Sequence, residues 1–288
     1  MHKIIFKTLQ HTQKYLLTSS KSYKTFSEIN TKNPLLETSQ FKILLNEKNP
    51  NLKVLDCSWY LPSDPRNGSK QFLEERIITS QFYDIDEIAD KSTDLPHMLP
   101  TNEFFIEKMK KMDIRIDDII VCYDKLGIFS SPRVWFNFKI YGAKNVYVLN
   151  GGYPKCLIEN LPVEKGNNYV FFYLKKSIIA RKYSADKDSF NYSKDSSRIK
   201  NLENMFELSE DIFKNKAKKN MIDVRSQGRY MGEEEEPRKT LKKGHVPGAE
   251  NIFFKNFLTA DGTYKTKEDI LETFQNAGNL IIYKRNKH

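Results

Sequence analysis

The stretch 119–141 reads IIVCYDKLGIFSSPRVWFNFKIY, and it carries the pattern that decides the fold. Its first five residues form an apolar run of strand length, which stops at Asp124, where a loop begins. Pro132 stands where a first helical turn accepts proline, so we predict a helix over 132–141. A strand, a loop and a helix in this order predict an α/β fold with a mostly parallel sheet.

The same alternation extends to both sides of this stretch. Short apolar runs that end in a polar residue or a glycine predict further strands at 53–56 and 145–149, and 103–112 has a helical pattern. In such folds the loops that follow the strands carry the chemistry. Functional residues are therefore expected directly after the apolar runs.

The second half of the chain repeats the first. An apolar strand that ends in aspartate occurs at Asp56 and again at Asp223, 167 positions later, and a charged approach to an apolar run occurs at 74–88 and at 242–257. A period of this size indicates two similar domains in tandem. Between them we predict a connector, followed by a helix at 202–218 and a strand at 220–224.

Charge and composition exclude several classes of protein. The chain is 39% hydrophobic and 29% charged, which excludes a mainly disordered protein, and no apolar run approaches the length of a membrane span. The net charge of +10 lies mostly at the two ends, since 1–27 holds five lysines and no acid, and 284–287 holds three more basic residues. The body is nearly neutral, so we expect neither a nucleic-acid nor a membrane partner.

The basic N-terminus has two interpretations. Residues 1–30 are rich in Lys, Ser and Thr and have apolar residues at helical spacing, as in a mitochondrial targeting presequence. The alternative is a disordered basic tail on a cytoplasmic protein. Three cysteines without CxxC spacing favour a reducing compartment, and the absence of a phosphate-binding glycine motif or a metal-ligand cluster predicts no cofactor.

Several motifs, in order and spacing, resemble the tandem-rhodanese sulfurtransferases from about Gln40 to Gly278. In the first half these are LDCSWYLP at 55–62, YDID at 83–86, HMLP at 97–100, SPRVW at 131–135 and LNGG at 149–152. In the second half they are DVRSQGRY at 223–230, EPR at 236–238, GHVPGA at 244–249 and DG at 261–262. The resemblance implies two rhodanese-like domains, each a mostly parallel sheet flanked by helices.

The resemblance also implies a substrate site. The arginine after Glu-Pro, Arg238, is similar to that of the 3-mercaptopyruvate enzymes, in which two arginines hold the substrate, and the other arginine here is Arg229. A planar carboxylate accepts two parallel hydrogen bonds from a guanidinium, which gives this assignment a physical basis. Thiosulfate as the donor remains an alternative, because only Arg238 speaks against it.

The family also uses a cysteine nucleophile in a glycine-rich loop, and this chain contains no such loop. By the family pattern the nucleophile falls about one residue beyond His288, so we expect a second domain that is cut short and exposes apolar surface from Ile252, Phe253, Phe254 and Phe257. The ending is either an incomplete copy or a genuine short form. Cys57, Cys122 and Cys156 are expected to be packing residues, and Asp124 stands where a nucleophile would stand in the first domain.

Three further polar features have mainly structural interpretations. His97 is expected to belong to a packed loop, and His245 to order a turn. The acidic run at 233–236 is expected to be solvated.

These inferences give four segments and a function. The segments are 1–30, a presequence or basic tail; 38–162, a non-catalytic rhodanese-like domain; 163–200, a connector; and 201–288, a truncated catalytic domain. The expected function is transfer of sulfur from 3-mercaptopyruvate or thiosulfate to cyanide or a thiol acceptor such as a thioredoxin-like protein, through a cysteine persulfide. The alternative is a non-catalytic rhodanese-like binding module.

Overall fold

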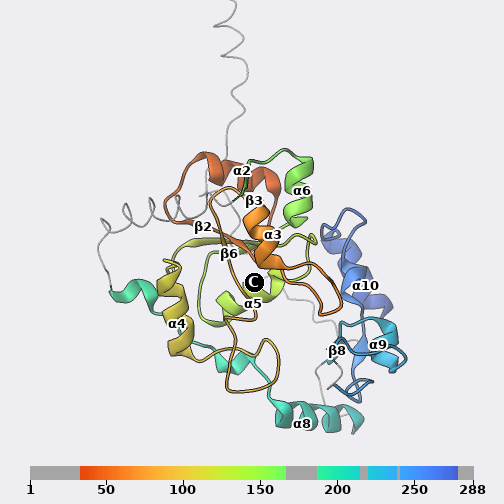
Figure 1. Ribbon diagram of the computed structural model, residues 1–288. Coiled ribbons are helices and arrows are strands. Elements are labelled where there is room, and N and C mark those ends of the chain that lie inside the picture. Colours follow the sequence, from red (N-terminus) through yellow and green to blue (C-terminus); the bar gives the residue numbers. More distant parts are fainter. Residues whose placement is uncertain (1–32, 167–186, 215–219, 239–240, 278–288) are drawn as a thin grey trace, which may run out of the picture.

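The computed structural model describes residues 33–166, 187–214, 220–238 and 241–277 (Figure 1). The predicted presequence at 1–30 lies outside these residues, and so does the C-terminal stretch 278–288, on which the expectation of a domain cut short depends. The described chain forms a larger first half around a central sheet, and a smaller second half that lies along one side of it (Figure 1).

The first half is built on a five-stranded sheet with the order β1-β6-β5-β2-β4. All neighbouring pairs in this sheet are parallel, as the sequence predicted. The central strands are buried along their whole length because helices cover both faces of the sheet. The strand bounds are β1 Leu35–Leu36, β2 Leu52–Asp56, β4 Ser80–Phe82, β5 Ile119–Tyr123 and β6 Val146–Leu149.

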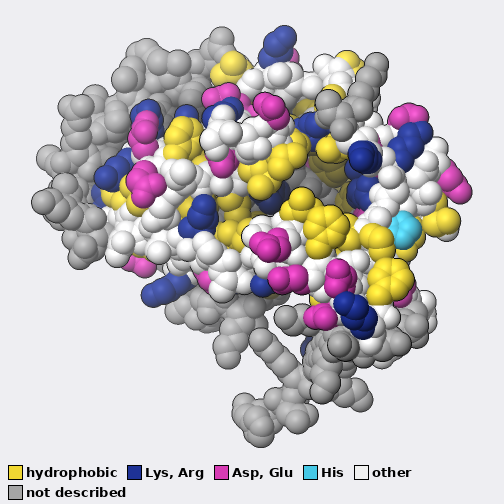
Figure 2. Space-filling view, turned by 90° about the horizontal axis from the view of Figure 1, so that it is seen from below, with side chains coloured by type: hydrophobic (Ala, Val, Ile, Leu, Met, Phe, Trp, Pro, Cys, Tyr) yellow, Lys and Arg dark blue, Asp and Glu magenta, His cyan; other side chains and the backbone are white. Residues whose placement is uncertain are grey.

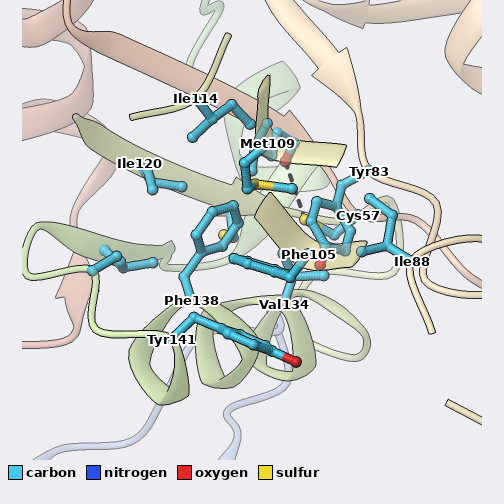
Figure 3. Packing of buried hydrophobic residues seen from close by; sticks show 14 of the residues in the cluster. Cys57, Tyr83, Ile88, Phe105, Met109, Ile114, Ile120, Val134, Phe138 and Tyr141 are labelled. Carbon is cyan, nitrogen blue, oxygen red and sulfur yellow. Dashed lines mark hydrogen bonds between the residues drawn. The ribbon is translucent and has the colours of Figure 1, made fainter. Parts of the chain in front are cut away.

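Alternate strand residues pack into two separate cores, one on each face of the sheet. Leu55 and Cys122 point to the face covered by α4 (Asn102–Lys111) and α5 (Ser131–Ile140). In this core Phe105 of α4 stacks on Tyr141 with ring centroids 3.9 Å apart (Figure 3). The opposite core contains side chains from α2 (Thr38–Asn46) and α6 (Gly152–Ile158).

Short elements complete the first half. The helix α3 (Gly68–Glu74) leads into β3 (Glu75–Ile77), which pairs antiparallel with β7 (Val163–Lys165). After the undescribed residues 167–186, η2 (Lys187–Phe190) and Tyr192 return to the first half, where the Tyr192 hydroxyl donates to the carbonyl of Ile114 at 3.1 Å. Part of the predicted connector therefore packs on the first half, and η3 (Ser196–Arg198) leads away from it.

The second half repeats the strand pairing of the first. Its strands β8 (Ile222–Asp223) and β9 (Glu250–Asn251) are parallel, and Asp223 at the end of β8 corresponds to Asp56 at the end of β2. The remaining elements are α8 (Leu202–Phe213), α9 (Gln227–Met231), η4 (Phe254–Phe257) and α10 (Lys267–Asn276). The predicted helix at 202–218 is confirmed up to Phe213, and residues 215–219 are not described.

The two halves contact each other through loops that follow strands. The amide of Tyr264 donates to Oδ1 of Asn150 at 2.9 Å, and the rings of Phe129 and Phe254 lie 6.1 Å apart. On the face drawn in Figure 2, Lys and Arg side chains are interspersed with Asp and Glu, and hydrophobic side chains gather near the centre.

The second half exposes apolar side chains, but the prediction of which side chains these are is wrong. Ile252 is buried, and Phe257 is partly covered because its ring packs on Phe274 of α10 at 5.0 Å. Phe253 and Phe254 are also partly covered. The exposed apolar side chains of the second half instead include those along α8, with Leu202 74%, Phe206 64% and Phe213 70% exposed.

Candidate functional site

The loop between β5 and α5 surrounds a buried carboxylate. Oδ2 of Asp124 accepts hydrogen bonds from the amides of Phe129, Ser130 and Ser131 and from the Ser131 hydroxyl, at 2.7–3.1 Å. Its Oδ1 accepts from the amide of Leu126 at 3.0 Å. Convergent amides next to a helix N-terminus form an anion site, and here the chain's own side chain fills it. As expected, a carboxylate stands in this loop.

A second buried carboxylate lies next to this loop, at the end of β2. Oδ1 of Asp56 accepts from the amide and the hydroxyl of Ser58, at 3.0 and 2.5 Å. Burial raises the pKa of Asp56 to about 6, although the hydrogen bonds from Ser58 lower it. The hydroxyl of Ser58 also accepts from the amide of Lys125, so the two loops are tied together.

All three cysteines are buried, as expected for packing residues. Cys57 and Cys122 lie in one core and Cys156 in the other. Burial raises the pKa of Cys57 well above its ordinary value and that of Cys156 to about 12. A reactive cysteine needs an accessible thiolate, and neither of these two thiols provides one at neutral pH.

A pocket of about 260 Å³ lies between the two halves, and it brings the two predicted substrate residues together. Arg229 and Arg238 line it from the second half, and Trp59, His97 and Arg133 line it from the first. The sequence predicted the two arginines as site residues but none of the three residues from the first half. All three lie in motifs on which the family resemblance rests, at 55–62, 97–100 and 131–135, and these motifs were the signal that could have found them.

Arg229 is held by a buried glutamate. Both its Nη2 and its Nε donate to Oε2 of Glu236, at 2.5 and 3.2 Å, while Oε1 accepts from Arg225 at 2.7 Å. The hydrogen bond from Arg229 keeps the pKa of Glu236 below its ordinary value. The expectation of a solvated acidic run is therefore wrong for Glu236, which is only 8% exposed because it joins two arginines.

Arg238 lies against an aromatic ring. Its guanidinium carbon is 5.9 Å from the ring centroid of Trp59, which reaches across from the first half. Among the described residues, no carboxylate lies within ion-pair distance of Arg238. This side chain is thus available to bind an anion from the pocket.

His97 lies in a packed loop, as expected, and it is held there by three contacts. Its Nε2 lies 2.8 Å from Oδ1 of Asp86, its ring meets the edge of Trp59 with centroids 4.8 Å apart, and its carbonyl accepts from Arg133. The other oxygen of Asp86 accepts from the Trp59 indole at 2.9 Å. Burial lowers the pKa of His97, and the charges of Arg238 and Arg133 add to this effect against the opposing effect of Asp86. At neutral pH the imidazole is uncharged.

The other predicted features have structural partners. Nδ1 of His245 lies 2.8 Å from the carbonyl of Tyr230, and the two rings stack at 3.7 Å, which agrees with a role in ordering a turn. Within the described ranges no group of three potential metal ligands occurs. In the same ranges no helix has both the length and the apolar character needed to cross a bilayer.

Comparison with known proteins finds sulfurtransferases among the relatives of this chain. The chain is 34% identical to rat 3-mercaptopyruvate sulfurtransferase over 227 residues, which cover 78% of this chain and 69% of the relative. It is 31% identical to the mitochondrial thiosulfate/3-mercaptopyruvate sulfurtransferase 1 of Arabidopsis thaliana, covering 86% of this chain and 65% of that protein. The chain thus spans about two thirds of the length of these relatives. No profile of a known protein family matches the chain.

Solved structures agree with the fold. The crystal structure of SseA from Escherichia coli, described as a rhodanese fold of 3-mercaptopyruvate sulfotransferases, matches with a TM-score of 0.69 and 24% identity. The match covers 86% of this chain and 85% of SseA. The predicted α/β fold with a mostly parallel, helix-flanked sheet is therefore confirmed as rhodanese-like.

Proposed function

The chain belongs to the family of 3-mercaptopyruvate and thiosulfate sulfurtransferases, and from this premise we propose that its pocket between the halves binds the anionic sulfur donor through Arg229 and Arg238. The observation that carries the proposal is that both arginines line one pocket, although they stand nine positions apart in the chain. Glu236 orients one guanidinium, and the other has no carboxylate partner among the described residues.

The preferred donor in this proposal is 3-mercaptopyruvate. Its planar carboxylate accepts two parallel hydrogen bonds from one guanidinium, whereas thiosulfate is tetrahedral and has no planar carboxylate. His97 is the group in the pocket wall that can accept or return a proton near neutral pH, because Asp86 holds its imidazole and the imidazole is uncharged.

Transfer of the sulfur requires a cysteine thiolate that holds it as a persulfide. Burial and a raised pKa argue against Cys57 and Cys156, and Cys122 is buried in the central strand β5. We therefore assign the role of nucleophile to none of the three. The sulfur acceptor in this proposal is cyanide, a small thiol or the thiol of a thioredoxin-like protein. The proposed cell compartment is the mitochondrion.

A second candidate function follows from the same cysteines. A rhodanese-like module that binds an anion or a partner without chemistry needs the two arginines but no accessible thiolate. The filled loop around Asp124 favours this alternative for the first half, because a carboxylate does not form a persulfide.

Binding is testable by tryptophan fluorescence. The chain has two tryptophans, of which Trp59 lines the pocket, whereas the indole of Trp135 donates to the carbonyl of Val146. Titration with pyruvate or thiosulfate should change the fluorescence of the wild type and of Arg198→Met, an exposed control. Arg238→Met should weaken binding at least tenfold, and unchanged binding in this variant would refute the proposed site.

Chemistry is tested separately from binding. The purified chain is incubated with 3-mercaptopyruvate and dithiothreitol, and released pyruvate is measured. We expect binding without release. Release that disappears in one of the three single Cys→Ser variants, while that variant keeps the unfolding midpoint of the wild type, would show that this cysteine is the nucleophile and would refute its assignment to packing.

A further inference from the structure

The pocket contains a third arginine, Arg133, which comes from the first half and from the start of α5. Its Nη2 donates to the carbonyl of His97, and its Nε is buried without a hydrogen-bond partner among the described residues. No carboxylate in the described ranges lies within ion-pair distance of it. Like Arg238, Arg133 therefore carries a charge that the described part of the protein leaves uncompensated.

The remaining charges around the pocket are largely matched. Glu236 binds Arg229, and His97 is uncharged at neutral pH. Asp86 contacts two residues of the pocket, but its side chain is 57% exposed and already accepts from His97 and Trp59, so water screens much of its charge. Arg133 donates to the carbonyl of His97, and both Arg238 and His97 lie against the ring of Trp59, so the two charges lie at the same part of the pocket.

We infer that the pocket is selective for small dianions, with Arg133 of the first half and Arg238 of the second half as the two uncompensated charges that such a ligand neutralises. This inference rests on the proposed function. Thiosulfate is one such dianion. 3-Mercaptopyruvate becomes another when its thiol loses a proton, so the pocket favours the thiolate form of this donor. Arg133 is then a specificity-determining residue, and the bound donor interacts with one arginine from each half.

A matched pair of ligands isolates the effect of charge. Thiosulfate and methanethiosulfonate have similar shape, but the second carries a methyl group in place of one oxygen and only one negative charge. An arginine charge about 6 Å from the ligand, at an effective dielectric constant of about 40, attracts each unit of negative charge on the ligand by about 1.4 kcal/mol. Its removal therefore lowers the affinity about tenfold for each unit of ligand charge. Neutralising Arg133 should thus weaken binding of the dianion about tenfold more than binding of the monoanion.

The experiment measures both affinities by the fluorescence of Trp59 at constant ionic strength. The wild type should prefer thiosulfate at least tenfold, Arg133→Met should lose about tenfold of this preference, and Arg133→Lys should keep it. Arg115→Met, which removes a partly buried arginine of the first half outside the pocket, is the matched control. Arg133→Gln, which is also uncharged but keeps a polar end group, serves as the neutral variant if Arg133→Met does not fold.

The outcomes separate this inference from the proposed function. Equal losses for both ligands in the neutral variants would show that Arg133 only supports the loop, and this would overturn the inference. A wild type that binds both ligands with equal affinity would also overturn it while leaving the proposed site intact. Failure of the wild type to bind either anion or pyruvate would refute the proposed function itself.

Discussion

Replacing Asp124 by asparagine should destabilise the first half, because this one carboxylate organises the whole loop between β5 and α5. Five hydrogen bonds end on it, four of them on Oδ2. Asparagine has nearly the same shape, but it offers one carbonyl oxygen and places an NH₂ group against amide donors. The substitution therefore tests the electrostatics of the loop with little change in packing.

The size of the effect follows from the number of these bonds. A hydrogen bond to a charged group contributes about 1 kcal/mol more than one between neutral groups, so the loss summed over these bonds is about 5 kcal/mol. The neutral side chain also avoids the cost of burying a charge, which offsets part of this loss. We expect the free energy of unfolding to fall by about 3 kcal/mol.

The assay is urea denaturation followed by tryptophan fluorescence, because both tryptophans of the chain lie in the first half. Asp117→Asn, at an exposed position just ahead of β5, is the matched control and should change stability by less than about 0.5 kcal/mol. A loss below about 1 kcal/mol in Asp124→Asn would refute the view that the carboxylate holds this loop together.

Three further predictions concern other parts of the chain. Burial raises the pKa of Asp56 in the folded state, so the contribution of its protonated form to stability is fully present below pH 3.8 and is lost as the pH rises toward 6. Asp56→Asn should remove about 3 kcal/mol of this pH dependence of the free energy of unfolding. An unchanged pH profile in urea denaturation would contradict the burial argument. A Cβ on Gly152, which has a φ of +54°, would lie 2.1 Å from the carbonyl oxygen of Gly127, so Gly152→Ala should lower the free energy of unfolding by about 3 kcal/mol. Gly166 has a φ of +74° but nothing within 4 Å of a Cβ, so Gly166→Ala should lower it by only about 1 kcal/mol. Equal unfolding midpoints of the two variants would disprove the clash. The pKa of His97 is lowered below 6.5, so protonation at acidic pH adds a positive charge beside Arg133 and Arg238, and thiosulfate should bind more tightly at pH 5 than at pH 7. In fluorescence titrations at the two pH values, His97→Gln should abolish this increase in affinity. An equal increase in this variant would assign the effect to another group.

The sequence by itself determined the fold class and the repeat. Apolar runs of strand length that end at Asp56, Asp124 and Asp223 were visible without any structure, because a strand buried on both faces needs a continuous apolar segment. Arg229 and Arg238 were also predicted, since their motifs resemble those of the sulfurtransferases, although the assignment of their role is still a proposal.

Only the tertiary structure decided what surrounds these arginines. Trp59 and His97 come from two separate loops of the first half and Arg133 from the start of a helix, and their meeting with Arg238 depends on how the two halves dock. Local sequence patterns contain no information about such contacts. The burial of Glu236 had the same origin, because a run of glutamates predicts solvation until two arginines are placed around one of them.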